Sequence, residues 1–140
     1  MTKEEFEIKL IEDLVKGIDD IYDYIIENIK ILRRNKGLFR EYFLNDPEAA
    51  YWYALQVDKC PRKATRKVAC KDPWFAYIYA LYIDECPRED TRKTACKDPE
   101  GACHYAYSVD KCPREDTFKA VKGTDWEEAY IEDIGRPNND

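Results

Sequence analysis

The segment DPWFAYIYA, residues 72–80, opens a 26-residue unit that ends at Lys97, and this unit decides the fold. Similar units occupy residues 46–71 and 98–123, and a Cys-Pro-Arg tripeptide stands at the same place in each copy. A fixed period of about 20 to 50 residues is typical of proteins built from stacked repeats, in which each copy buries its apolar side against its neighbours. We therefore expect an all-α protein made of stacked helical hairpins, a short α-solenoid.

Each unit contains two sequence signals for the start of a helix. Asp72-Pro73 is one, because aspartate is a favoured N-cap residue and proline fits the first helical position. Cys86-Pro87 is the second, so we expect helices from Pro73 to about Asp84 and from Pro87 to about Cys96. The first helix of each unit has apolar residues spaced i, i+3, i+4, i+7, which lie on one helical face. This face carries Ala50, Tyr53, Ala54 and Val57, then Ala76, Tyr79, Ala80 and Ile83, then Ala102, Tyr105, Ala106 and Val109.

The flanking segments are expected to cap the stack within a single domain, residues 1–140. Residues 38–46 stand where the second helix of a hairpin would be, as part of an N-terminal helical cap over residues 1–45. Residues 124–134 form a C-terminal capping helix that is one residue out of register. In the first cap Ile11, Ile18, Ile25 and Leu32 recur every seven residues, on one long helix or on two that break at Gly17. We expect this cap to pack on the first hairpin, but heptad spacing also suits a homodimer.

Composition favours a globular protein with a mixed surface. The chain has 23 basic and 29 acidic residues, a net charge of −6, and they are interleaved along the sequence. This pattern argues against nonspecific nucleic-acid binding and falls short of the dense acidic surface of a DNA mimic. No apolar run approaches the length of a transmembrane helix, and the first residues lack the pattern of a signal peptide. Six cysteines without an export signal indicate free thiols in a reducing cytoplasm.

The sequence offers no convincing catalytic or metal-binding group, so we predict no enzyme activity, no metal and no cofactor. The three Cys-Pro cysteines precede an expected helix start, which would lower their pKa, but small buried turn residues are the simpler interpretation. The repeated Asp58, Asp84 and Asp110 are assigned structural roles. The best metal candidates, Cys96, Cys103 and His104, lack the paired spacing of a zinc site. The six cysteines are Cys60, Cys70, Cys86, Cys96, Cys103 and Cys112.

Two surfaces are candidates for binding a partner. The side of each first helix opposite its alanine stripe is aromatic and aliphatic, which is typical of a protein-binding patch if neighbouring helices do not cover it. Its residues are Trp52, Leu55, Trp74, Ile78, Leu81, His104 and Tyr107. The alternative is a basic ladder on the second helices that follows a phosphate backbone, although nearby Glu and Asp suit ion pairs equally well. The ladder consists of Arg66, Lys67, Arg92, Lys93 and Lys97.

The unit at residues 72–80, with its Cys-Pro-Arg turn and the restart at Lys97-Asp98-Pro99, resembles the short Asp-Pro-x-x-Ala-Tyr-x-Tyr-Ala helical repeats of bacteriophage and some bacterial proteins. The resemblance covers residues 46–131 and departs in the third copy at Gly101, Cys103 and His104. It implies origin and fold more than an activity. Small phage proteins often block host defence, so by analogy we expect a non-enzymatic inhibitor that binds a host defence or nucleic-acid-processing protein. Nucleic-acid binding and structural self-assembly are the alternatives.

Overall fold

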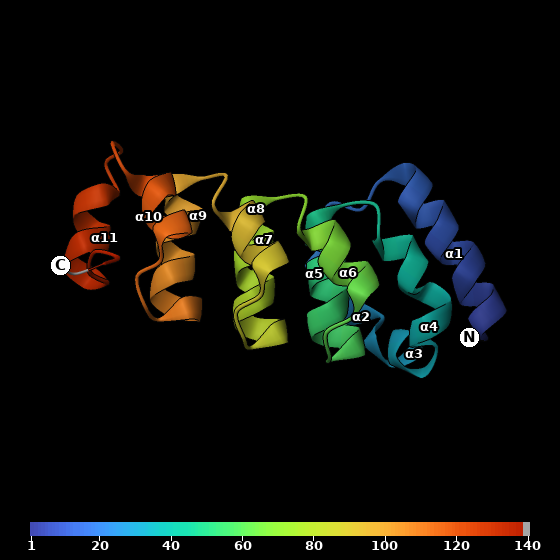
Figure 1. The fold of residues 1–140 in the computed structure, drawn as a ribbon. Helices are drawn as coiled ribbons and strands as arrows, with labels where there is room; N and C mark the ends of the chain where they lie inside the picture. Colours follow the sequence, from blue (N-terminus) through green and yellow to red (C-terminus); the bar gives the residue numbers. More distant parts are fainter. Residues whose placement is uncertain (139–140) are drawn as a thin grey trace. The chain divides into compact units, whose positions relative to one another are not determined.

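The computed structural model describes residues 1–138, and the regular structure in this range is entirely helical, as predicted. The chain forms two compact units, Met1–Val68 and Ala69–Asp140 (Figure 1). The prediction of one domain stays a prediction, since two compact units can belong to one domain. The first unit contains α1 (Lys3–Lys16), α2 (Ile21–Glu27), α3 (Ile29–Arg34), α4 (Lys36–Phe39), η1 (Arg40–Phe43), α5 (Pro47–Tyr53) and η2 (Ala54–Asp58), and α6 (Lys63–Ala69) spans the boundary.

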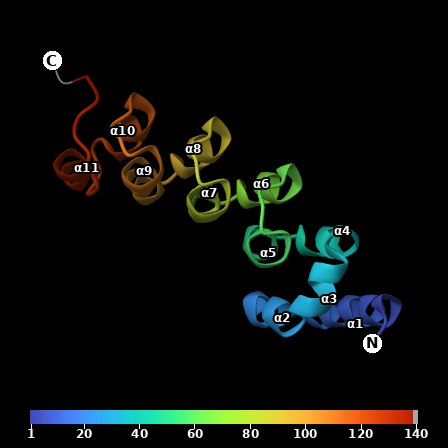
Figure 2. The same cartoon turned by 90° about the horizontal axis from the view of Figure 1, so that it is seen from below.

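The second unit is a series of helix pairs that pack in chain order, like a short solenoid. Seen end-on in Figure 2, α7, α9 and α11 form one row, and α8 and α10 form another. The predicted alanine and tyrosine stripe of the first helices lies in the core, with Tyr79 and Tyr105 fully buried. The elements are α7 (Pro73–Tyr79), η3 (Ala80–Asp84), α8 (Glu89–Ala95), α9 (Pro99–Tyr105), η4 (Ala106–Asp110), α10 (Glu115–Val121) and α11 (Glu127–Asp133).

The first helix of each hairpin starts as predicted and ends in an unexpected way. The Asp72 carboxylate accepts a hydrogen bond from the Phe75 backbone N–H at 3.0 Å, so it is the expected N-cap. The last residues of each first helix, in η2, η3 and η4, form a π-helical turn. The residue after each turn is left-handed, with φ of 55° at Lys59 and Glu85 and 58° at Lys111. Because glycine is the residue that adopts this region freely, each turn carries backbone strain.

The second helices begin later than the prediction placed them. Arg88 is the N-cap of α8 in an extended conformation, and the helix starts at Glu89 instead of Pro87. The reason is a hydrogen bond in which the Tyr105 hydroxyl accepts the Arg88 backbone N–H at 3.0 Å, which holds Arg88 outside the helix. The Cys-Pro pairs therefore lie in exposed loops, and the expectation that Cys86 stands at a helix start is wrong.

The first unit is built around α1, α2 and α3, which pack on α4, η1 and α5. Its core contains Phe6, Leu10, Ile25, Leu32, Phe39, Phe43, Ala49, Tyr53 and Val57. The predicted break at Gly17 is confirmed, with a φ of 94°. The break interrupts the apolar face predicted from Ile11, Ile18, Ile25 and Leu32. Ile25 and Leu32 are fully buried, whereas Ile11 is exposed. The N-terminal segment thus packs on the first hairpin through more than one helical face.

Candidate protein-binding surface

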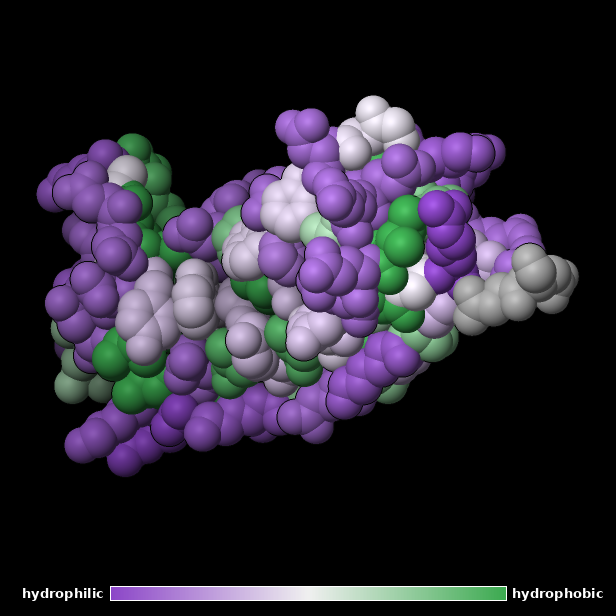
Figure 3. All heavy atoms as spheres, turned by 90° about the vertical axis from the view of Figure 1, so that its left-hand side faces the viewer, coloured by the Kyte–Doolittle hydropathy of each residue, from purple (hydrophilic) through white to green (hydrophobic). Residues whose placement is uncertain are grey.

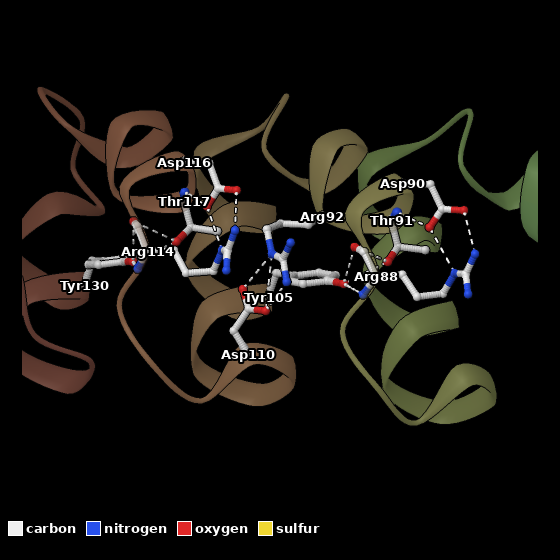
Figure 4. A network of polar contacts seen from close by, with 10 residues as sticks. All are labelled: Arg88, Asp90, Thr91, Arg92, Tyr105, Asp110, Arg114, Asp116, Thr117 and Tyr130. Atoms are coloured by element: carbon white, nitrogen blue, oxygen red, sulfur yellow. Dashed lines mark hydrogen bonds and ion pairs between the residues drawn. The ribbon is translucent and has the colours of Figure 1, made fainter. Parts of the chain in front are cut away.

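A repeated polar joint holds each hairpin to the next in the second unit (Figure 4). The Tyr105 hydroxyl lies 2.8 Å from Thr91 Oγ1, and both side chains are fully buried. In the following copy Tyr130 stands 2.7 Å from Thr117 Oγ1 and accepts the Arg114 backbone N–H at 3.0 Å. The predicted shift of one residue at the C-terminal cap is confirmed, because Tyr130 makes the same joint from one position earlier.

A buried ion pair accompanies this joint. Arg92 Nη2 donates to Asp110 Oδ1 at 2.6 Å and Nε donates to Oδ2 at 3.0 Å, with the two side chains 10% and 2% exposed. The hydrogen bond to Asp110 raises the pKa of Arg92 above its ordinary value. In the first unit Arg40 makes the same bidentate pair with Asp58, at 2.6 and 2.9 Å. The structural role predicted for Asp58 and Asp110 is confirmed.

The N-terminal cap imitates the second helix of a hairpin, as predicted. The Tyr53 hydroxyl donates to the Lys36 carbonyl at 2.6 Å, the same sequence offset at which Tyr105 meets Arg88. Arg40 likewise pairs with an aspartate eighteen residues later, as Arg92 does. Residues 36–43 therefore present the next hairpin with the contacts that a complete repeat would supply.

The ion pairs change the interpretation of the basic ladder. Arg92 is buried in its ion pair with Asp110, so its guanidinium is not available to bind a phosphate group. Arg66 is half-buried, and the three ladder lysines, Lys67, Lys93 and Lys97, are exposed. Two further exposed arginines, Arg88 and Arg114, each lie 3.2 Å from an aspartate. The ladder is thus mixed in charge and in exposure, which weakens it as a phosphate track.

Aromatic rings from three successive first helices meet on the other side of the second unit, in a group that we call the aromatic cluster: Trp74, Tyr77, His104 and Trp126. The His104 ring centroid lies 5.6 Å from those of Tyr77 and Trp126 and 6.3 Å from that of Trp74. Trp74 and Tyr77 are 5.5 Å apart. Tyr77 is buried, but Trp74 is 48% exposed and the His104 side chain 38% exposed. One side of the cluster therefore packs on the protein and the other side faces solvent.

Close packing of neighbouring helices supports the base of this cluster. A Cβ added at Gly101 would lie 2.8 Å from the Ala95 carbonyl oxygen, a distance that real Cβ atoms do not reach. Glycine at this position therefore allows α9 to approach α8 closely. On the next turn of α9, His104 Nε2 lies 3.6 Å from the Glu100 carboxylate, which orients the ring within the cluster.

The seven predicted contact residues separate into exposed and covered groups. Trp74, His104 and Tyr107 reach solvent, and Tyr107 is 60% exposed. Ile78 is only 8% exposed, so it belongs to the part of this face that neighbouring helices cover. The reason is that α7 packs against both α8 and α9, which leaves little of its circumference free. The remaining members, Leu55, Leu81 and Trp52, are half-buried.

Trp52 illustrates the alternative that neighbouring helices cover part of this face. Its ring lies 4.6 Å from that of Tyr22 in α2 and 4.9 Å from that of Tyr51. It also packs against the core of the first unit. Trp52 therefore serves the docking of α2 onto α5.

Sequence reasoning missed Tyr82 and Trp126 as surface aromatics. Tyr82 is 57% exposed, and Trp126 is half-buried at the N-cap of α11. Two periods of 26 residues separate Trp126 from Trp74, but the one-residue shift of the C-terminal cap places Trp126 at the position of Gly101, so the period gave no direct signal for it. Figure 3 shows near-white and green side chains interspersed among the purple hydrophilic ones, so the face in view is mixed in hydropathy.

The cysteines differ in exposure. Cys60, Cys86 and Cys112 are exposed, so the expectation of buried turn residues is wrong for these three. Burial raises the pKa of Cys96 to about 11 and also raises that of Cys103, so both thiols favour the neutral form. Within residues 1–138, no three His, Cys, Asp or Glu side chains converge to hold a metal ion. In the same range, none of the helices has the length and apolar character required to cross a bilayer.

Comparisons of the chain with protein-family models, with curated proteins and with solved structures gave no match. The 26-residue helical hairpins and their repeated Tyr–Thr and Arg–Asp pairs are features of the structure itself. Where the chain binds a partner is therefore inferred from its own surface.

Proposed function

We propose that this chain is a non-enzymatic protein-binding module that docks a partner protein on the exposed side of the aromatic cluster. The observation that carries the proposal is Trp74, a half-exposed tryptophan whose ring rests against Tyr77 and His104. Tryptophan and tyrosine dominate the energetics of many protein interfaces. A ring already held by its neighbours loses little conformational freedom on binding, which favours affinity.

The surface extends along the same helices. Leu81 lies in the π-helical turn η3 that ends the helix of Trp74, and Tyr107, 60% exposed, lies in the corresponding turn η4 that ends the helix of His104. Polar and charged residues surround these side chains, such as Glu100 beside His104. An apolar centre with a polar rim is the usual anatomy of a protein interface.

The resemblance to repeats of bacteriophage proteins suggests the kind of partner. We propose that the chain occupies a surface of a host defence or nucleic-acid-processing protein in the host cytoplasm and blocks it stoichiometrically. The alternative in which the chain binds nucleic acid depends on exposed lysines, Lys67, Lys93 and Lys97, and the pairing of Arg92 with Asp110 counts against it. Structural self-assembly is a third proposal.

The test compares proteins captured from a bacterial lysate, with and without nuclease treatment, and identified by mass spectrometry. Wild type is compared with Trp74→Ala/Tyr107→Ala, and Lys93→Ala/Lys97→Ala serves as the surface control. We expect one dominant protein that survives nuclease, is retained by the lysine variant and is lost with the aromatic variant. Capture that disappears with nuclease supports the lysines instead, and equal capture by all three chains rejects the aromatic cluster.

A folding control makes the loss of capture interpretable. Trp74→Ala removes a half-exposed ring and should leave the helical signal in circular dichroism and the melting temperature nearly unchanged. Trp52→Ala removes a ring that packs on Tyr22 and the core of the first unit, so it should lower the melting temperature. If both substitutions destabilise equally, Trp74 belongs to the core and the proposal loses its main residue.

A further inference from the structure

Helix α1 has two apolar sides, and only one of them is used by the fold. Its inner side inserts Phe6 and Leu10 into the core of the first unit, where they are 1% and 0% exposed. On the outer side Ile8, Ile11 and Val15 are 62%, 44% and 83% exposed. Their spacing of three and four residues aligns them in one seam along the helix. We call these three residues the α1 seam.

The position of α1 does not depend on this seam. The Tyr24 hydroxyl donates to the Asp13 carboxylate at 2.8 Å, and the Tyr42 hydroxyl donates at 2.9 Å to Glu7, on the edge of the seam opposite Glu5 and Glu12. Neither contact involves a side chain of the seam itself. Nor does helix formation favour these residues, because isoleucine and valine form helices less readily than alanine, leucine or lysine. Single exposed apolar residues are ordinary, but three β-branched residues aligned on a helix that is already anchored indicate a contact surface.

The charges beside the seam are acidic. Glu4, Glu5 and Glu12 are exposed and fall on or next to the seam when α1 is viewed down its axis. The exposed Lys9 side chain is directed to Asp13 and Tyr24, with Nζ 3.4 Å from the carboxylate and 5.4 Å from the ring centroid. Lys16, four residues after Glu12, is also exposed but lies further from the seam than the glutamates do. A partner that covers the seam therefore meets a row of carboxylates at its edge.

This charge pattern selects among occupants. In an antiparallel pair of α1 helices, Glu5 and Glu12 of one copy would face the same residues of the other, and like charges at these flanking positions oppose pairing. A helix with apolar residues in its seam and lysine or arginine beside it meets both requirements. We propose that α1 binds an amphipathic helix of another protein whose apolar seam is flanked by basic residues. This second docking surface does not depend on the aromatic cluster.

The test uses three fluorescein-labelled designed peptides and the full chain, with affinities measured by anisotropy. The first peptide is a helix with leucine in the seam and lysine at the flanks, the second has the same composition in scrambled order, and the third carries glutamate in place of lysine. We expect wild type to bind the first peptide at least about tenfold more tightly than the scrambled one. The scrambled peptide controls for simple attraction of cations to an acidic protein.

Two surface variants examine the apolar and the charged parts separately. Ile8→Gln/Val15→Gln should abolish the preference for the ordered peptide, and Glu5→Lys/Glu12→Lys should transfer it to the glutamate peptide. Equal binding of ordered and scrambled peptides, or an unchanged preference in the glutamine variant, overturns the proposal. A concentration-dependent dimer of wild type that Ile8→Gln/Val15→Gln dissolves also overturns it, in favour of a second copy.

A matched control keeps this result separate from the proposed function. Trp74→Ala/Tyr107→Ala should bind the ordered peptide as wild type does, because neither residue belongs to the first unit. Loss of peptide binding in that variant would place the peptide on the aromatic surface and would reject α1 as its site. Circular dichroism of every variant should superimpose on wild type, since all of the substituted seam and flank residues are exposed.

Discussion

Replacing Arg92 by methionine should destabilise the second unit more than any substitution of an exposed residue. The change would leave the Asp110 carboxylate, whose side chain is 2% exposed, without its bidentate partner. Removing one member of a buried ion pair costs about 3–5 kcal/mol, because the remaining charge stays desolvated. Arg92 keeps 10% of its side chain exposed, so we expect a loss near the lower end, about 3 kcal/mol.

The decisive measurement is the coupling between the two residues. Arg92→Met/Asp110→Ala removes both charges together, so it should cost clearly less than the sum of the single substitutions, by about 2 kcal/mol. The chain contains a natural precedent, because Phe118 stands at the position of Arg92 in the last hairpin and Gly135 at that of Asp110. The ring of Phe118 packs on Tyr130 there, with centroids 5.5 Å apart.

Urea unfolding followed by circular dichroism supplies the free energies, and hydrogen exchange of peptides from α8 and α9 places the loss in the second unit. Exchange is needed because two compact units can unfold separately, and a single transition would then mix them. Additive losses, with a coupling below about 0.5 kcal/mol, would refute the reasoning. So would a stable Arg92→Met variant, since it would mean that solvent reaches Asp110 freely.

Three further changes test other features of the fold. Gly101→Ala should lower the free energy of unfolding in urea by about 1–3 kcal/mol, because the clash with the Ala95 carbonyl outweighs the gain of about 1 kcal/mol in helix propensity. A higher free energy of unfolding would contradict this. Lys111→Gly should raise stability by about 0.5–1 kcal/mol by relieving the left-handed strain at φ 58°, and a lower melting temperature would count against it. Burial raises the pKa of Tyr105 and Tyr130, so stability should hold below about pH 10 and fall as the pH rises further. Urea titrations with absorbance at 295 nm would show this, and an undiminished free energy of unfolding at high pH would argue the opposite.

The sequence predicted the architecture well because its strongest signals are periodic. Alanine and tyrosine at fixed helical spacing, with Asp-Pro at each start, leave one arrangement in which every copy buries the same face. Tyr53, Tyr79 and Tyr105 all lie in that buried face and are fully buried. These features depend on local spacing, which a single chain displays directly.

The misplaced features depend on tertiary contacts that carry little local signal. The second helix starts at Glu89 because the hydroxyl of Tyr105, from the following hairpin, accepts a hydrogen bond from the Arg88 backbone N–H. The residues next to Arg88 in the sequence give no sign of this long-range contact. The left-handed turn residues are lysine and glutamate instead of glycine, so the strained end of each first helix is not visible in the sequence. The burial of Ile78 was left open by the sequence, because a helical wheel shows one buried side, whereas α8 and α9 both pack against α7.

The direction of the tyrosine joint has a consequence for how such a chain changes length. In the second unit each hairpin is completed by a hydroxyl that comes from the element after it, and Tyr130 of α11 completes the last one. Tandem duplication of residues 98–123 by unequal recombination would therefore supply each new copy with a tyrosine that bonds to the copy before it. The threonine and arginine of the new copy would bond to the tyrosine of the copy after it. The gene can therefore lengthen or shorten by whole periods while every junction keeps the same contacts.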